Sequence, residues 1–289
     1  MASVRKLFLR WRRWRGPCLA LALAGPAAGA PAAPAAFELD VESIATGPCR
    51  MEGPGAADQG GGSQSITASF LARRPLGGAG WYAGGGFQAE DYFFADNPAW
   101  PRRLQDYAAA LALEYYRDGE SVASLTAQPG FYFGTHAALS AWDVPFTLVS
   151  GVPVASDFAG VIGVSNGRFY HHALPIAGFV WTLGPRVRLE AVYPEPALVL
   201  TLDRATTLRL GGELTGEGFL VDAPAGRTVV EYSSYRVGLE WRRDWRPGVR
   251  LALGAGFEVE RTFDYFRRQG RLQGTGNGYV KFSAEFSGN

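Results

Sequence analysis

Apolar and polar residues alternate one by one along much of this chain. The alternation is clearest in four segments, residues 208–214, 235–242, 250–259 and 279–286. A period of two places successive side chains on opposite faces of an extended backbone, so each segment predicts a β-strand with one apolar and one polar face. Weaker segments of the same kind are residues 37–44, 65–73, 80–92, 104–117, 121–133, 142–152, 158–165, 173–183, 186–193 and 197–203.

Residues 104–117 also admit a helical interpretation. In this segment Tyr107, Ala109, Leu111 and Leu113 occupy alternate positions, which favours a strand. Counted as a strand, it brings the predicted segments to about 14 by this period-two criterion. Several segments are weak and one connection, residues 193–196, is short, so about 12 strands fit equally well.

The connections between these segments alternate between short and long. Residues 184–185 and 246–248 make short turns, whereas residues 45–64, 93–103 and 262–274 make long loops. Short turns at one end and long loops at the other are typical of outer-membrane barrels, in which the number of strands is even. The pattern therefore predicts an all-β fold, a transmembrane antiparallel up-and-down β-barrel of about 12 to 14 strands.

We expect this single barrel to occupy most of the chain. It should span residues 65–286, after an N-terminal strand and a Gly/Pro-rich loop over residues 36–64. Neither an internal repeat nor a linker marks a second domain.

Composition narrows the choice of fold class. Hydrophobic residues make up 47% of the 289 residues, too many for a disordered chain. The mean hydropathy is only -0.04, and no apolar run reaches the roughly 18 residues of a membrane-spanning helix. The 38 glycines disfavour a mainly helical fold, because glycine destabilises helix interiors. An all-β protein remains, in water or in lipid.

Three features favour lipid outside the predicted sheet. Several segments are long for a soluble sheet and suit tilted membrane strands. The last segment ends in Phe286, and barrel-assembly machinery reads a terminal strand with an aromatic end, although residues 287–289 follow here. Aromatic residues also gather at segment ends, as in the two interfacial girdles of membrane barrels; examples are Trp81, Tyr82, Tyr92, Phe93, Phe131, Phe133, Trp241, Trp245, Phe263 and Tyr265.

The N-terminus has the features of a secretory signal peptide. Residues 1–35 hold six basic residues and no acidic one. Within this stretch the basic residues come first, and a short apolar run and then small residues follow them. We expect cleavage near Ala35/Ala36, which changes the net charge from +1 to −5. An acidic mature chain does not attract the negatively charged phosphates of nucleic acid, so a nucleic-acid partner is not expected. Outer-membrane lipids, and the assembly machinery during biogenesis, are the expected partners.

The alternation divides the last four strands into two sets of side chains. In a membrane barrel the polar set faces the lumen and the apolar set faces lipid. The predicted lumen charge ladder comprises Arg209, Glu213, Glu217, Arg236, Glu240, Arg242, Arg250, Glu258, Glu260, Lys281 and Glu285. The predicted lipid-facing set comprises Leu208, Leu210, Leu214, Val237, Leu239, Trp241, Leu251, Leu253, Phe257, Val280, Phe282 and Phe286.

Opposite charges on neighbouring strands of the ladder lie within cross-strand reach. The ladder can neutralise itself and stiffen the wall, or it can line a polar pore and tune ion selectivity. We therefore expect a structural or passive pore and transport role, with no cofactor and no metal.

The histidines carry an alternative function, a lipid-modifying hydrolase or acyltransferase. Such an enzyme needs a serine with a base in hydrogen-bond reach. Ser165 or Ser156 could be combined with His171 or His172, with Asp157 as the orienting residue. No spacing requires this arrangement, so we predict no catalytic residue. A soluble periplasmic β-barrel that binds a ligand is the third hypothesis.

Several stretches resemble an uncharacterised bacterial family of outer-membrane β-barrels, catalogued as a domain of unknown function. They are residues 163–168, 174–178, 186–196, 235–241 and 258–266. Where family members have an Asp-Arg pair in one loop, this chain has Asn166-Gly167-Arg168. The resemblance implies a barrel in the outer membrane of a Gram-negative bacterium and carries over no catalytic residue.

Cell fractionation tests the membrane prediction. We expect the mature protein in the outer-membrane fraction, migrating differently on gels before and after boiling because a folded barrel resists detergent. Recovery in the periplasmic fraction without this heat-dependent shift would support the soluble alternative instead.

Overall fold

The computed structural model describes most of the chain beyond the predicted signal peptide. It covers residues 34–53, 61–77, 80–95, 100–117, 120–169, 173–223, 226–266 and 270–288. The predicted signal peptide, up to residue 33, and the loop residues His171 and His172 lie outside the described residues. In the described part, the helical structure is limited to the 3₁₀ turn η2 (Leu139–Ala141). No described helix is both long and apolar enough to cross a membrane.

The described chain forms a closed antiparallel barrel of 14 strands, as predicted from the alternation. Two wall strands are each interrupted once: β6 and β7 both pair with β5, while β9 pairs with β6 and β8 with β7. The strand elements are β1 (Phe37–Thr46), β2 (Arg50–Glu52), β3 (Ser63–Pro75), β4 (Trp81–Phe94), β5 (Arg103–Arg117), β6 (Glu120–Ala127), β7 (Gly130–Phe133), β8 (Trp142–Asp143), β9 (Phe146–Pro153), β10 (Phe158–Asn166), β11 (Ala173–Thr182), β12 (Val187–Tyr193), β13 (Ala197–Thr201), β14 (Thr206–Ala223), β15 (Gly226–Arg246), β16 (Val249–Tyr265) and β17 (Arg271–Gly288).

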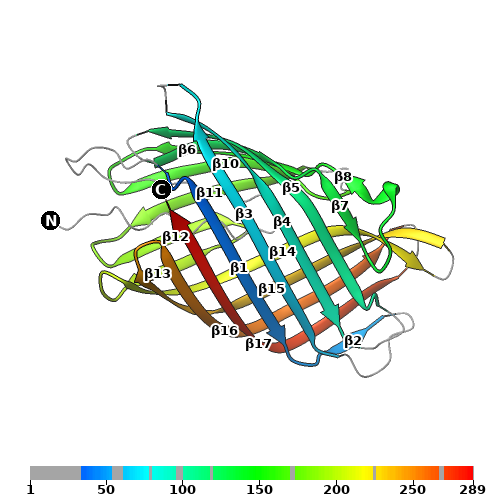
Figure 1. Ribbon diagram of the computed structural model, residues 1–289. Helices are drawn as coiled ribbons and strands as arrows, with labels where there is room; N and C mark the ends of the chain where they lie inside the picture. The colour runs from blue at the N-terminus through cyan, green and yellow to red at the C-terminus, as the bar shows by residue number, and fades with distance from the viewer. Residues whose placement is uncertain are drawn as a thin grey trace.

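The first and last strands close the barrel. β1 pairs with β3 on one side and with β17 on the other, from Phe37 opposite Gly288 to Thr46 opposite Tyr279 (Figure 1). The extra strand β2 pairs with β17 beyond the end of β1. Residues 104–117, for which a helix was the alternative, form the strand β5, so the prediction of a strand is confirmed.

The two ends of the barrel differ in their connections. At the end where β1 begins, the connections are short, for example residues 183–186 and 247–248; we call this the short-turn end. The opposite end, with residues 47–62, 95–102 and 134–141, we call the long-loop end. Along each wall strand alternate residues face the interior, except where a β-bulge breaks the alternation.

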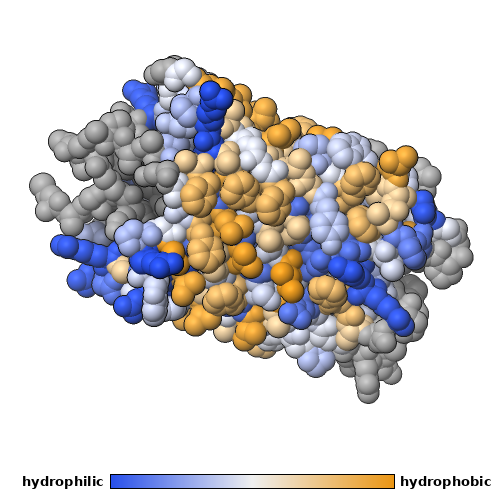
Figure 2. Space-filling model, viewed as in Figure 1, coloured by the Kyte–Doolittle hydropathy of each residue, from blue (hydrophilic) through white to orange (hydrophobic). Residues whose placement is uncertain are grey.

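The outer face of the wall is apolar. Leu239 is 50% exposed, Phe257 59% and Val280 61%, and apolar side chains form a broad band between polar ends (Figure 2). The predicted lipid-facing residues lie on this face, on the alternate positions of β14 to β17. A barrel in water would bury such residues, so this inverted arrangement identifies lipid as the surrounding medium.

The wall is uneven at the long-loop end. β12 and β13 have only 7 and 5 residues, while β14 and β15 have 18 and 21. Beyond the ends of β12 and β13, toward the long-loop end, β14 pairs with β7 in place of β13. Leu220 lies opposite Phe133, and the Gly134 amide donates to the Leu220 carbonyl at 2.9 Å. The barrel is therefore narrowed at this end, and interior side chains from distant strands come into contact there.

A charge on the outer face of β15 tests the facing assignment. Leu239→Arg is expected to lower the free energy of unfolding by about 2–4 kcal/mol, because arginine near the bilayer midplane loses its hydration. The matched control is Trp245→Arg, on the same face near the short-turn end, where the cost is about 0–1 kcal/mol. Denaturant unfolding in lipid vesicles measures both values. Equal costs at the two positions would contradict the orientation of β15 in the membrane.

Candidate functional site in the barrel interior

Charged side chains from around the wall gather inside the barrel. They occupy inward positions on the strands, except Arg168, which comes from the connection between β10 and β11, and Glu195, from the connection between β12 and β13. We call these residues the interior charged set. Its acidic members are Glu38, Asp40, Glu42, Glu90, Asp106, Glu114, Glu190, Glu195, Glu213, Glu217, Glu240, Asp244, Glu258 and Glu285. Its basic members are Arg73, Arg168, Arg188, Arg209, Arg236, Arg242, Arg250, Arg261 and Lys281.

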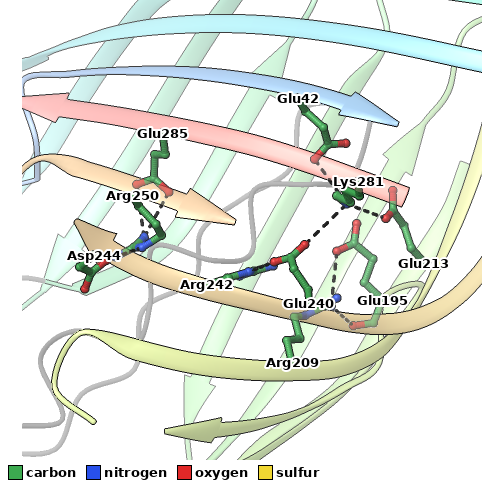
Figure 3. A network of polar contacts seen from close by, with 10 residues as sticks. All are labelled: Glu42, Glu195, Arg209, Glu213, Glu240, Arg242, Asp244, Arg250, Lys281 and Glu285. Atoms are coloured by element: carbon green, nitrogen blue, oxygen red, sulfur yellow. Dashed lines mark hydrogen bonds and ion pairs between the residues drawn. The ribbon is translucent and has the colours of Figure 1, made fainter. Parts of the chain in front are cut away.

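Lys281 on β17 is the centre of the largest cluster. Its Nζ lies 3.3 Å from Glu42 on β1, 3.2 Å from Glu213 on β14 and 3.9 Å from Glu240 on β15 (Figure 3). Arg242 pairs with Glu240 in the same cluster. Carboxylates from three strands thus converge on one ammonium group. Closure of β1 against β17 brings Glu42 into reach, and the register places Gly254, which has no side chain, between Lys281 and Glu240.

Arg236 and Arg209 extend this cluster along β14 and β15. Arg236 lies 3.4 Å from Glu213 and donates to the Thr215 hydroxyl at 3.2 Å. Arg209 lies 3.9 Å from Glu195. The cross-strand register places Arg209 opposite Glu240 and Glu213 opposite Arg236, the proximity that the sequence pattern predicted for neighbouring strands.

Two further clusters lie near the short-turn end. Arg250 on β16 lies between Asp244, at 2.6 Å, and Glu285, at 3.1 Å (Figure 3). On the other side of the β1–β17 closure, Arg73 on β3 lies 3.0 Å from Glu38 and contacts Glu114.

The sequence pattern did not single out Arg73, Glu38 and Glu114. They belong to weaker segments, where small residues and polar residues on both faces obscure the alternation. All three nevertheless lie within predicted strands. The signal available in the sequence was therefore the set of alternate positions, on each strand, that face the interior.

Arg168 lies near the long-loop end and is almost fully buried. Its Nη1 donates to Glu217 on β14 at 2.7 Å, and its Nη2 pairs with Asp106 on β5. The guanidinium also lies over the rings of Tyr132, at 4.3 Å, and Phe219, at 5.2 Å. The connection between β10 and β11 therefore reaches into the interior and joins β5 to β14.

Backbone geometry supports the position of this connection. Phe169 has a φ of 54°, an unusual left-handed conformation for a residue with a side chain, and its amide donates to Asp143. A Cβ at Gly218 would lie 2.3 Å from the Arg168 carbonyl. Gly218 thus lets the loop backbone approach β14, and a larger residue there would displace it.

An apolar core fills the interior beside Arg168. Tyr92 on β4 contacts Tyr232 on β15 with ring centroids 5.0 Å apart, and Phe94 contacts Phe263 on β16 at 5.1 Å. These contacts cross the barrel rather than following the wall. The interior consequently has a charged part toward the short-turn end and, at the long-loop end, an aromatic part that lies beside the Arg168 cluster.

Glu260 does not join the predicted ladder. Tyr235 pairs with Glu260 but Arg236 pairs with Glu258, so Val259 is one extra residue in β16. Such a β-bulge reverses which face the following residues occupy. Glu260 accordingly lies at an exposed edge, 3.0 Å from Arg271, and its assignment to the lumen was wrong. The other ladder residues, Arg209, Glu213, Glu217, Arg236, Glu240, Arg242, Arg250, Glu258, Lys281 and Glu285, lie in the interior charged set.

Of the Ser–His arrangement considered for an enzyme, the structure describes Ser156, Asp157 and Ser165, while His171 and His172 lie outside the described residues. Ser165 is buried and its hydroxyl lies 2.8 Å from that of Thr147. Ser156 and Asp157 precede β10, whereas Ser165 is near its far end, a separation of about 25–30 Å at ~3.3 Å per residue. The described residues also contain no group of His, Cys, Asp and Glu side chains placed to hold a metal ion.

His136 lies on a loop at the long-loop end. Its Nδ1 is 3.1 Å from Asp222 at the tip of the β14–β15 hairpin, and Arg227 donates to the same carboxylate at 3.1 Å. The hydrogen bond with His136, assisted by Arg227, lowers the pKa of Asp222. All three side chains are exposed, so this group is a surface tether of the loop.

The closed barrel, its apolar outer face and its charged interior define the class as an outer-membrane β-barrel. No protein-family model matches the chain, and no curated protein matches it. Among solved structures, the chain is similar to an outer membrane channel from Pseudomonas putida F1, with 10% identity, a TM-score of 0.50, and coverage of 90% of this chain and 98% of that one.

Two other barrels have lower structural similarity. The Pseudomonas putida toluene transporter TodX has a TM-score of 0.38 at 10% identity, covering 95% of this chain and 96% of its own. A mutant Rh. blastica porin has a TM-score of 0.30 at 9% identity, covering 86% and 99%. At 10% identity, the similarity to the Pseudomonas putida F1 channel concerns the fold alone, and that fold is the outer-membrane barrel that the family resemblance implied.

Removing Arg168 tests the role of the buried cluster. Arg168→Ala leaves Glu217 and Asp106 without their shared guanidinium, and we expect the free energy of unfolding to fall by about 3–5 kcal/mol. The matched control is Arg227→Ala, which breaks an exposed pair and costs about 0–1 kcal/mol. Denaturant unfolding in detergent micelles gives both values. A loss at Arg168 no larger than that at Arg227 would argue against a buried, structurally important ion pair.

Proposed function

We propose that this protein is a passive channel of a Gram-negative outer membrane. The observation that carries the proposal is the interior charged set, enclosed by a wall whose outer face is apolar. Ionised side chains are costly to bury in an apolar medium unless they are paired or hydrated. An interior rich in paired charges is suited to hydrated solutes, and closed membrane barrels use such linings as passages.

The aromatic core limits the expected size of the passage. It spans the interior from β4 to β15 and β16 at the long-loop end, and Arg168 lies beside it. We infer a narrow channel for small solutes, in which side chains at the long-loop end must move aside during passage. A role as a wide, permanently open pore is less compatible with these contacts.

The proposal includes export and assembly. We propose that a signal peptide is removed near Ala35/Ala36. In support, the Arg73 amide donates to the Ala36 carbonyl at 2.6 Å, next to the first residue of β1, so this cleavage leaves the closing strand intact. Outer-membrane lipids would surround the apolar face, and assembly machinery would read β17, in which Phe286 is outward and exposed.

We propose no enzymatic activity. The separation of Ser156 and Asp157 from the far end of β10 supports this view.

Reconstitution in planar lipid bilayers tests the channel. We expect discrete current steps of small amplitude, because the long-loop end is narrow. The unmodified purified protein is also incubated with lipid vesicles as an enzymatic control. Absence of current steps would contradict a channel, and release of fatty acids that is lost in His171→Ala or His172→Ala would favour the lipid-hydrolase alternative.

A further inference from the structure

The interior charged set is not balanced, because its acidic members outnumber its basic members. The surplus of acidic side chains has a repeated local form, in which one basic side chain lies between two carboxylates from different strands. We call each such group a triad. We propose that the channel selects small cations over anions. This inference rests on the proposed channel function and adds the class of solute.

The first of these triads is at the short-turn end on the β3 side. The guanidinium of Arg73 lies 3.0 Å from Glu38 on β1 and contacts Glu114 on β5. All three side chains are at least nine-tenths buried. One positive and two negative groups leave this triad with a formal charge of about −1 at neutral pH.

The second triad is at the same end on the β16 side. Arg250 lies 2.6 Å from Asp244 on β15 and 3.1 Å from Glu285 on β17. The register also places Asp40 of β1 opposite Glu285, so two inward carboxylates are adjacent on neighbouring strands. These two triads therefore place a surplus of acidic side chains in the interior on both sides of the β1–β17 closure.

The third triad is at the other end of the interior. Arg168 pairs with both Asp106 and Glu217, again one basic side chain between two acidic ones. By contrast, Arg236 and Arg242 bring the cluster around Lys281 close to neutrality. A solute that passes from either end consequently meets a triad with more acidic than basic side chains before it reaches the balanced middle.

Charge of this kind decides which ions pass. Rings of Asp and Glu side chains favour cations in channels, and a passage with apolar walls strengthens the field within it. Small hydrated monovalent cations, such as potassium or an organic ammonium, fit both the sign of the lining and the narrow aromatic end. Small anions would be repelled at the three triads.

Reversal potentials across a planar bilayer with a potassium chloride gradient test the selectivity. For the full mature chain we expect the sign of a cation-selective channel. Glu114→Gln leaves Arg73 paired with Glu38, and Glu285→Gln leaves Arg250 paired with Asp244. Because each remaining pair is balanced in charge, each variant should fold. Each should also shift the reversal potential toward zero. Lys281→Gln should shift it in the opposite direction. The control Glu260→Gln removes an exposed edge carboxylate and should change nothing.

A second measurement does not depend on resolving current steps. Vesicles containing the protein are loaded with radiolabelled choline or sulfate, and faster release of choline is expected, with the difference reduced in Glu114→Gln and Glu285→Gln. Folding of each variant is checked by its heat-dependent gel shift. Conductance or release that is non-selective or favours anions overturns cation selectivity while leaving the channel intact. If both current and release stay at the level of protein-free vesicles, the proposed channel function is overturned, and the selectivity with it.

Discussion

Every backbone hydrogen bond of a strand in lipid must be satisfied within the protein, because the bilayer core offers no water. The rest of this structure depends on that constraint. It requires β1 to meet β17, and the two strands pair from Phe37 opposite Gly288 to Thr46 opposite Tyr279. Closure in turn separates the lipid outside the barrel from the interior. Of the alternate residues along a strand, one set then faces lipid and the other faces the interior.

The interior then receives the buried charged side chains of the strands. Charged groups in this space are stable when they pair, and closure brings partners together from strands that are distant in sequence. Lys281 shows the effect, since its three carboxylates come from β1, β14 and β15. Arg168 shows it at the other end, where one loop residue joins β5 to β14. The same groups that stabilise the wall also determine its electrostatic character, so structure and selectivity are properties of one set of residues.

The aromatic core gives the barrel an asymmetry that suits a selective rather than an open passage. Short β12 and β13 let β14 approach β7, and the narrowed end places Tyr92 against Tyr232. An apolar contact across the interior excludes water locally, which makes nearby charge more effective. The buried pairings of Arg168 lie beside this region, where the electrostatic contribution of each charge is largest.

The sequence by itself determined the class of fold, the approximate strand number and the facing of most residues, because a period of two is a local property of the backbone. It could not determine the phase after Val259, since a bulge arises from the pairing of β15 with β16, and Glu260 was misplaced for that reason. Nor could it combine Arg73 with Glu38 and Glu114, or place Arg168 in the interior, because these contacts join separate segments. Only the tertiary structure decided them, by the closure that brings those segments together.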